Sequence, residues 1–230
     1  MNLESNLTTV KNNIKKAAEK SGRKLEDITL IGVTKTIDVD VMKNAIESGI
    51  KNIGENKVQE IQRKYELLNN NDLKWHMIGH LQSNKVKYII DKVHLIHSLD
   101  RMSLAKELQK RAKKINRSVD ALIQVNISEE ESKFGLYGDE VIDFLEKILK
   151  FDNINVKGLM TMAPHVEDPE KVRYVFKQLK GLSKDIEKKG FENTEMKYLS
   201  MGMTNDYEVA IEEGSNMVRV GRAIFGERNY

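Results

Sequence analysis

Cysteine is absent from the 230-residue sequence, and this absence excludes disulfides, thiolate zinc sites and cysteine nucleophiles. A chain without disulfides suits a reducing compartment, so we expect a cytoplasmic protein. The two prolines are too few for a proline-rich linker. No apolar run approaches the roughly 18 residues of a membrane-spanning helix. The first residues also lack the basic-then-apolar order of a signal peptide. We therefore expect no membrane partner.

An excess of charge of one sign is also missing. The 38 basic and 35 acidic residues give a formal net charge of +3, without the basic excess of a nucleic-acid-binding surface. We therefore expect no nucleic-acid partner. Apolar residues make up 40% of the chain and recur throughout it, which excludes disorder as the main state. A chain of this length buries roughly 70–75% of its unfolded surface, so a large core is available.

Short apolar, β-branched runs alternate with helical patterns along the whole chain. The runs that predict strands are 28–35, 50–54, 74–79, 93–99, 120–127, 154–160, 196–201 and 216–221. Between them, apolar residues recur every three to four positions, as in the stripe of Leu104, Leu108 and Ala112. Strands that alternate with helices are typical of a parallel sheet covered by helices.

Eight such units without a break predict one α/β domain over residues 1–230, folded as a (β/α)₈ barrel of the TIM type. An open, doubly wound sheet is the alternative. The chain begins with a helical stripe that includes Leu3, Val10 and Ala17, and it ends soon after the eighth strand. We expect this extra N-terminal helix to take the place of a missing last helix.

The working residues of α/β barrels lie at the carboxyl ends of the strands. Lys35 follows the first apolar run, so its amine is expected to enter the mouth of the barrel. Partial burial disfavours the charged ammonium and makes the amine nucleophilic toward a carbonyl. This position favours a Schiff base with an aldehyde, although a solvated lysine at a strand end is the simpler interpretation.

Two glycine-containing segments follow the last two predicted strands. In 199–206 (LSMGMTND), Asn205 is predicted to cap a helix, and in 219–226 (RVGRAIFG) Gly221 opens a short helix. Barrels often hold a phosphate in the loops after these strands, although both segments could be ordinary turns. An aldehyde-reactive lysine and a phosphate site together suit pyridoxal 5'-phosphate (PLP), whose charge Arg222 could help to neutralise. Arg219 points the same way as Gly221 and could meet the pyridine nitrogen.

A metal site is not expected. His76 and His80 have HxxxH spacing, but on a strand the two side chains are about 13 Å apart. The sequence offers neither cysteines nor a nearby carboxylate cluster to complete the site. The spacing of His94 and His97 suggests structural or solvated side chains.

Several ordered blocks together resemble the pyridoxal phosphate homeostasis proteins, the YggS/PROSC family. The blocks are VTK (33–35), GENKVQE (54–60), WHMIGHLQSNK (75–85), HSLDR (97–101), QVNISEEESKFG (124–135), GLMTMAP (158–164), LSMGMTNDYEVAIEEGSNMVRVG (199–221) and AIFG (223–226). The resemblance runs from about residue 28 to residue 226. It implies a barrel similar to the N-terminal domain of alanine racemase.

The resemblance also implies PLP homeostasis as the function, with PLP held as an internal aldimine and without established turnover. By this resemblance Lys35 is the Schiff-base lysine, and Asn56 lies near the aldimine. The implied phosphate site consists of Ser200, Gly202, Gly221 and Arg222. Arg219 is implied to face the pyridine nitrogen. PLP-dependent apoenzymes are the expected recipients, and we expect a monomer.

Two positions depart from the family pattern. Lys57 stands where an aromatic residue is common, and Arg222 stands where threonine is common. The alternative function is a PLP-dependent, racemase-like enzyme of low activity. Racemases of this type add a second domain with a tyrosine base, for which we expect no room in a chain that stops at Tyr230. A Schiff-base aldolase acting on a sugar phosphate is a further alternative.

Overall fold

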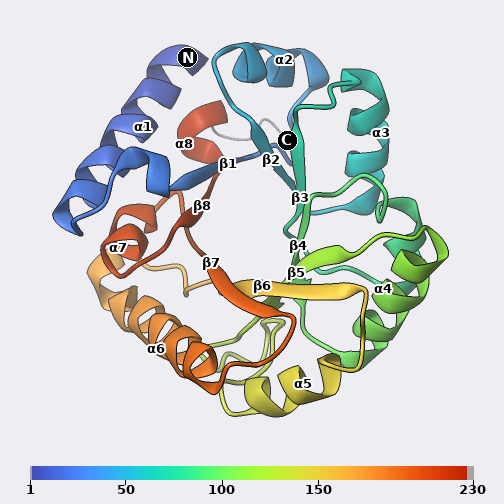
Figure 1. Ribbon diagram of the computed structural model, residues 1–230. Helices are drawn as coiled ribbons and strands as arrows, with labels where there is room; N and C mark the ends of the chain where they lie inside the picture. Colours follow the sequence, from blue (N-terminus) through green and yellow to red (C-terminus); the bar gives the residue numbers. More distant parts are fainter. Residues whose placement is uncertain (1, 227–230) are drawn as a thin grey trace.

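Eight parallel strands close into a barrel surrounded by helices (Figure 1). The structure is a computed structural model, and it describes residues 2–226. The strands are β1 (Thr29–Val33), β2 (Asn52–Glu55), β3 (Lys74–Met77), β4 (Leu95–Leu99), β5 (Val119–Gln124), β6 (Ile154–Met160), β7 (Thr194–Met203) and β8 (Met217–Val220). Each strand pairs with the next, and β8 pairs with β1. The predicted TIM-type barrel is therefore confirmed, and the open sheet is excluded.

The helices cover the outside of the barrel. They are α1 (Leu3–Lys20), α2 (Val39–Glu47), α3 (Val58–Leu68), α4 (Met102–Lys114), α5 (Glu140–Ile148), α6 (Arg173–Lys189), α7 (Tyr207–Glu212) and α8 (Arg222–Phe225). Short 3₁₀ turns occur at η1 (Leu25–Asp27), η2 (Ser83–Tyr88) and η3 (Pro169–Val172). No helix among residues 2–226 is long and apolar enough to cross a membrane.

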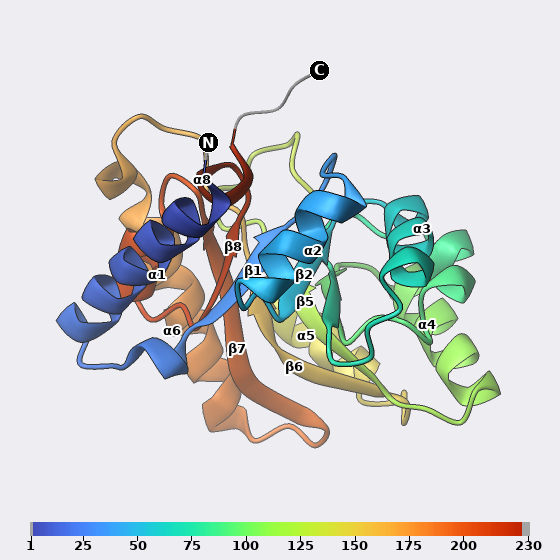
Figure 2. The same cartoon turned by 90° about the horizontal axis from the view of Figure 1, so that it is seen from above.

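The N-terminal helix α1 lies beside the last elements of the chain (Figure 2). Its predicted apolar stripe is buried at Leu7, Val10 and Ile14, because these residues recur on one helical face. Asn6 donates a hydrogen bond to the carbonyl of Ile224 in α8 at 3.1 Å. Helix α1 thus covers the barrel next to β8 and β1, as the sequence predicts.

The core has two parts. Most buried apolar residues lie between the strands and the surrounding helices, and a smaller cluster is formed by Ile31, Leu95, Leu122, Met160 and Met217. Polar side chains are buried as well, among them His97, Ser200 and Arg219. Burial of such groups is tolerated only when they are hydrogen-bonded, so these contacts constrain the structure strongly.

The end of β7 differs from its prediction. The strand continues to Met203, whereas the apolar run predicted an end at residue 201. Helix α7 begins at Tyr207 with Asp206 as its N-cap, so the prediction of Asn205 as the cap is wrong. The Asp206 carboxylate accepts the backbone N–H of Met203 at 2.6 Å, which closes the turn between β7 and α7.

Candidate functional site

A cavity of about 430 Å³ opens at the carboxyl ends of β1, β6, β7 and β8. Its lining consists of Val33, Lys35, Ala163, Pro164, His165, Val166, Pro169, Met203, Thr204, Asn205, Asp206, Arg219, Gly221 and Arg222. This is the end of the barrel where α/β barrels carry their working residues. Its volume suits a small organic ligand.

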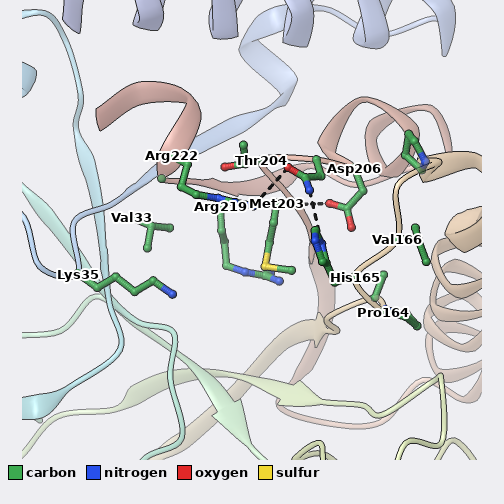
Figure 3. Close-up of a pocket in the computed structure, with 14 residues that line it drawn as sticks. Val33, Lys35, Pro164, His165, Val166, Met203, Thr204, Asp206, Arg219 and Arg222 are labelled. Atoms are coloured by element: carbon green, nitrogen blue, oxygen red, sulfur yellow. Dashed lines mark hydrogen bonds between the residues drawn. The ribbon is translucent and has the colours of Figure 1, made fainter. Parts of the chain in front are cut away.

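Lys35 lies just beyond the end of β1, and its side chain extends across the cavity toward Arg219 (Figure 3). Lys35 is half-buried. It also lines a neighbouring crevice of about 420 Å³, whose other wall includes Asn56 and Lys57. Asn56 therefore shares a crevice with Lys35 but does not line the larger cavity.

A buried ion pair lies beneath the Lys35 loop. The Lys64 ammonium of α3 donates to the Glu55 carboxylate at 2.8 Å and to the backbone carbonyl of Thr34 at 2.8 Å. Its third partner is the Glu60 carboxylate, at 3.0 Å. The Thr34 hydroxyl donates to the same Glu55 oxygen at 2.6 Å. Burial raises the pKa of Glu55, and the contacts with Lys64 and Thr34 oppose that shift. The cluster fixes the backbone next to Lys35.

Arg219 of β8 is buried at the inner end of the cavity. Its guanidinium donates to the Ser200 hydroxyl at 2.5 Å and to the Thr161 carbonyl at 2.8 Å. Burial lowers the pKa of Arg219 to about 10, while the Asp206 carboxylate acts in the opposite direction. The group therefore remains a cation at neutral pH. A guanidinium has five N–H donors, so it can hold these two acceptors and still present a donor to a ligand.

The outer end of the cavity is formed by the loops that follow β6, β7 and β8. Arg222 donates to the Asn205 side chain at 3.4 Å, and this contact joins the β7 and β8 loops. Asn205 also lies 3.5 Å from the His165 ring of the β6 loop. Figure 3 shows these interactions as dashed lines. Thr204 adds a hydroxyl to the same lining. Hydroxyl, amide and guanidinium donors around one space are suited to an anion.

Of the seven residues predicted for the site, Lys35, Arg219, Gly221 and Arg222 line the cavity. Ser200 lies deeper, with its hydroxyl between Arg219 and His97. Gly202 is also buried, and it packs against α7. The reason is the length of β7, which places both residues within the strand rather than in the loop after it.

The structure adds cavity residues that the sequence analysis did not single out. Met203 and Thr204 belong to the segment 199–206 and line the cavity. The signal that could have identified them is the polar Thr204 directly after the Met-Gly-Met sequence at the end of the strand. His165 comes from the loop after β6. No local pattern marks it, because the pairing of β6 with β7 brings this loop next to the β7 loop.

Comparison with known proteins places the chain in a family. The family described as alanine racemase, N-terminal domain, matches residues 5–229. The pyridoxal phosphate homeostasis protein of Aquifex aeolicus is 46% identical, with 100% of both chains covered. The chain belongs to the pyridoxal phosphate homeostasis protein family. The member of this family from Escherichia coli K12 is 36% identical, and the match covers 98% of this chain and 96% of that protein.

Solved structures agree with this assignment. A protein of Bifidobacterium adolescentis superposes with a TM-score of 0.92 at 36% identity, over 97% of this chain and 94% of that chain. PipY of Synechococcus elongatus with PLP bound gives a TM-score of 0.85 at 27% identity, over 98% and 100%. Alanine racemase of Clostridium difficile, at 18% identity, shares the fold with a TM-score of 0.76. That match covers 100% of this chain and 57% of the racemase.

Proposed function

We propose that this protein binds PLP at the cavity through Lys35 and acts in PLP homeostasis as a carrier rather than an enzyme. The observation that carries the proposal is the joint position of one lysine amine and two arginines, Arg219 and Arg222, in a single small cavity. The homeostasis proteins to which the chain is similar, and the PLP-bound PipY, support this assignment.

The residues of the cavity fit the cofactor. PLP supplies an aldehyde that condenses with a lysine amine: a C=N bond replaces the C=O bond, and water leaves. Among the described residues, Lys35 is the lysine that lines the cavity, where its side chain is half-buried.

The phosphate is assigned to the outer loops. Thr204 and Arg222 offer a hydroxyl and a guanidinium there. A Cβ at Gly221 would approach the Val33 carbonyl oxygen at 3.3 Å, so the glycine keeps this part of the wall clear. In this arrangement Arg222 supplies a forked donor where threonine is common in the family. Ser200 and Gly202 contribute from behind the wall, by holding Arg219 and the β7 turn.

Arg219 supports the non-catalytic part of the proposal. A guanidinium can only donate hydrogen bonds, so it favours an unprotonated acceptor on the ring that faces it. An unprotonated pyridine is a weaker electron sink and gives little help to carbanion formation. Because Lys35 is half-buried, a group bound to it would stay accessible to water and to amines, which suits release of PLP to recipient apoenzymes. We propose that the chain performs this role as a monomer.

The first prediction is the loss of covalent PLP in Lys35→Ala. Wild-type protein mixed with PLP should show the visible imine band. Borohydride reduction should then fix the label on Lys35, as located by peptide mass spectrometry. Lys57→Ala is the matched control, because Lys57 lines the neighbouring crevice and should leave the label in place. A reduced adduct that persists at another lysine in Lys35→Ala would show that the assignment is wrong.

The same protein separates a carrier from an enzyme. Wild-type protein loaded with PLP is incubated with a panel of amino acids, and racemisation, transamination and decarboxylation are followed. We expect no turnover above that of free PLP. Steady turnover that disappears in Lys35→Ala would establish the racemase-like alternative.

A further inference from the structure

A line of polar side chains crosses the interior of the barrel and ends at Arg219, and all of them are buried except the half-buried Asn52. Asn52, His76, His97 and Ser200 come from β2, β3, β4 and β7. The His76 ring nitrogens lie 3.1 Å from the Asn52 side-chain oxygen and 3.0 Å from the His97 Nε2 atom. The His97 Nδ1 atom lies 2.9 Å from the Ser200 hydroxyl, which accepts from Arg219 at 2.5 Å. The line thus joins one side of the barrel to the other.

The two ends of this line determine the direction of every hydrogen bond in it. Arg219 can only donate, so the Ser200 oxygen accepts and its proton points to the His97 Nδ1 atom. His97 therefore carries its proton on Nε2 and donates to the Nδ1 atom of His76. His76 in turn donates from Nε2 to the carbonyl oxygen of Asn52, which accepts. All donors and acceptors match when both histidines are neutral with Nε2–H.

The opposite direction does not satisfy the same atoms. If His97 donated from Nδ1, the Ser200 oxygen would receive two donors and its own proton would need another acceptor. Among the described residues, the Ser200 hydroxyl has only His97 and Arg219 as hydrogen-bond partners. A buried hydroxyl proton without an acceptor destabilises the protein, because the hydrogen bond that it makes to water in the unfolded chain is not replaced. A doubly protonated His76 would place its Nδ1–H against the Nε2–H of His97. A doubly protonated His97 would again leave the Ser200 proton without an acceptor.

We propose that His97 and His76 are positioning residues that orient the Ser200 hydroxyl and thereby hold the Arg219 guanidinium at the inner end of the cavity. The part of this inference that concerns PLP rests on the proposed function. The tautomers and the restraint of Arg219 do not, because they are properties of the protein without a ligand. Burial lowers the pKa of both histidines, which is consistent with neutral rings.

The tautomers can be measured in the protein without PLP. The chain has five histidines, so ¹⁵N-labelled histidine gives a spectrum that single substitutions can assign. At neutral pH we expect His76 and His97 each to show one protonated nitrogen, Nε2, and one unprotonated nitrogen, Nδ1. A proton on Nδ1 of either ring, or averaging between the two tautomers, would overturn the proposed direction.

A pair of isosteric substitutions at position 97 tests the positioning role. In His97→Asn the amide oxygen takes the place of Nδ1 and still accepts from Ser200. In His97→Gln the amide nitrogen takes the place of Nε2 and still donates to His76, but the acceptor for Ser200 is lost. We expect His97→Gln to lose about tenfold in PLP affinity, because the buried Ser200 hydroxyl is left without its acceptor. His97→Asn should stay near the wild type.

Two further measurements link the effect to Arg219. In the unliganded wild type, the Arg219 side-chain nitrogens should give separate, slowly exchanging signals. In His97→Gln these signals should average, whereas His94→Asn should leave them unchanged. His94 is the matched control because its ring touches His76 edge-on but makes no hydrogen bond to the line within residues 2–226. Once Ser200→Ala is present, His97→Gln should have no additional effect on PLP affinity.

The outcomes separate this inference from the proposed function. If the wild type does not bind PLP, the proposed function fails, and the histidine and Arg219 signals still decide the positioning role. If PLP binds but His97→Asn and His97→Gln lose affinity equally, His97 acts only by filling space and the inference fails. The inference also fails if the Arg219 side-chain nitrogens exchange equally slowly in wild type and in His97→Gln.

Discussion

At the scale of single residues, Lys64 determines how the backbone next to Lys35 is held. Its ammonium is fully buried and has three acceptors: the Glu55 and Glu60 carboxylates and the Thr34 carbonyl. A buried ammonium with three acceptors satisfies all its donors. Removal of only one partner leaves an uncompensated charge, which costs far more than the pair contributes.

We predict that Lys64→Met lowers the free energy of unfolding by about 3–5 kcal/mol, because Glu55 is left buried without its cation. The double variant Lys64→Met, Glu55→Met should recover most of this loss, since no buried charge remains in the pair. Urea unfolding of wild type, both single variants and the double variant gives the coupling. A double variant as unstable as Lys64→Met would contradict the prediction.

At the scale of elements, the turn from β7 to α7 determines the shape of the cavity wall. Gly202 has φ +95°, a conformation that strains an L-residue. A Cβ at this position would also lie 2.7 Å from the Ala210 Cβ and 2.9 Å from the Tyr207 Cα. The close approach of α7 to β7 therefore depends on the missing side chain, and the residues 203–206 that line the cavity depend on this approach.

We predict that Gly202→Ala lowers the free energy of unfolding by about 2–4 kcal/mol, as strain and steric overlap add. PLP affinity should fall as well, because the turn that carries Thr204 must move. The matched control is Gly181→Ala on the exposed face of α6, where a Cβ meets nothing within 4 Å. This control should stabilise the protein by about 0.4–1 kcal/mol. Thermal unfolding that ranks the two variants equally would refute the account.

At the scale of the whole molecule, the barrel interior contains neutral histidines that the unfolded chain would protonate. Burial lowers the pKa of His76 from 6.5 to about 3, and it lowers the pKa of His97 well below the ordinary value. Between these limits the unfolded state binds more protons than the folded state. The free energy of unfolding therefore rises with pH in this window. Protonation weakens the fold as the pH falls from 6.5 toward 3.

We predict that His76→Asn reduces the slope of stability against pH between about pH 4.5 and 6.5. Each buried histidine contributes at most about 1.4 kcal/mol per pH unit to this slope. Chemical unfolding at a series of pH values gives the slopes for wild type and variant. Carboxyl groups titrate in both proteins, so the difference between the two slopes gives the contribution of His76. Equal slopes would show that His76 is protonated alike in the folded and unfolded states.

The strand pattern was readable because burial on both faces requires continuous apolar runs, and each of the eight runs corresponds to a strand. Helix α1 could be predicted because it is buried on one face only, which requires an apolar stripe with a period of 3.6 residues. The end of β7 was not readable. Ser200, Gly202 and Met203 differ in side chain but share one strand, and pairing with β6 and β8 decides where that strand stops.

The alternation of elements and the position of Lys35 at a strand end follow from local apolar periodicity, so both can be predicted from the amino-acid order alone. The set of side chains that share the cavity, as opposed to those that lie behind it, depends on how the strands pair in the folded barrel. Ring closure brings β8 beside β1 and aligns His97 with Ser200, residues far apart in the chain. Hydrogen bonds between such distant groups depend on strand register, and no local pattern encodes that register.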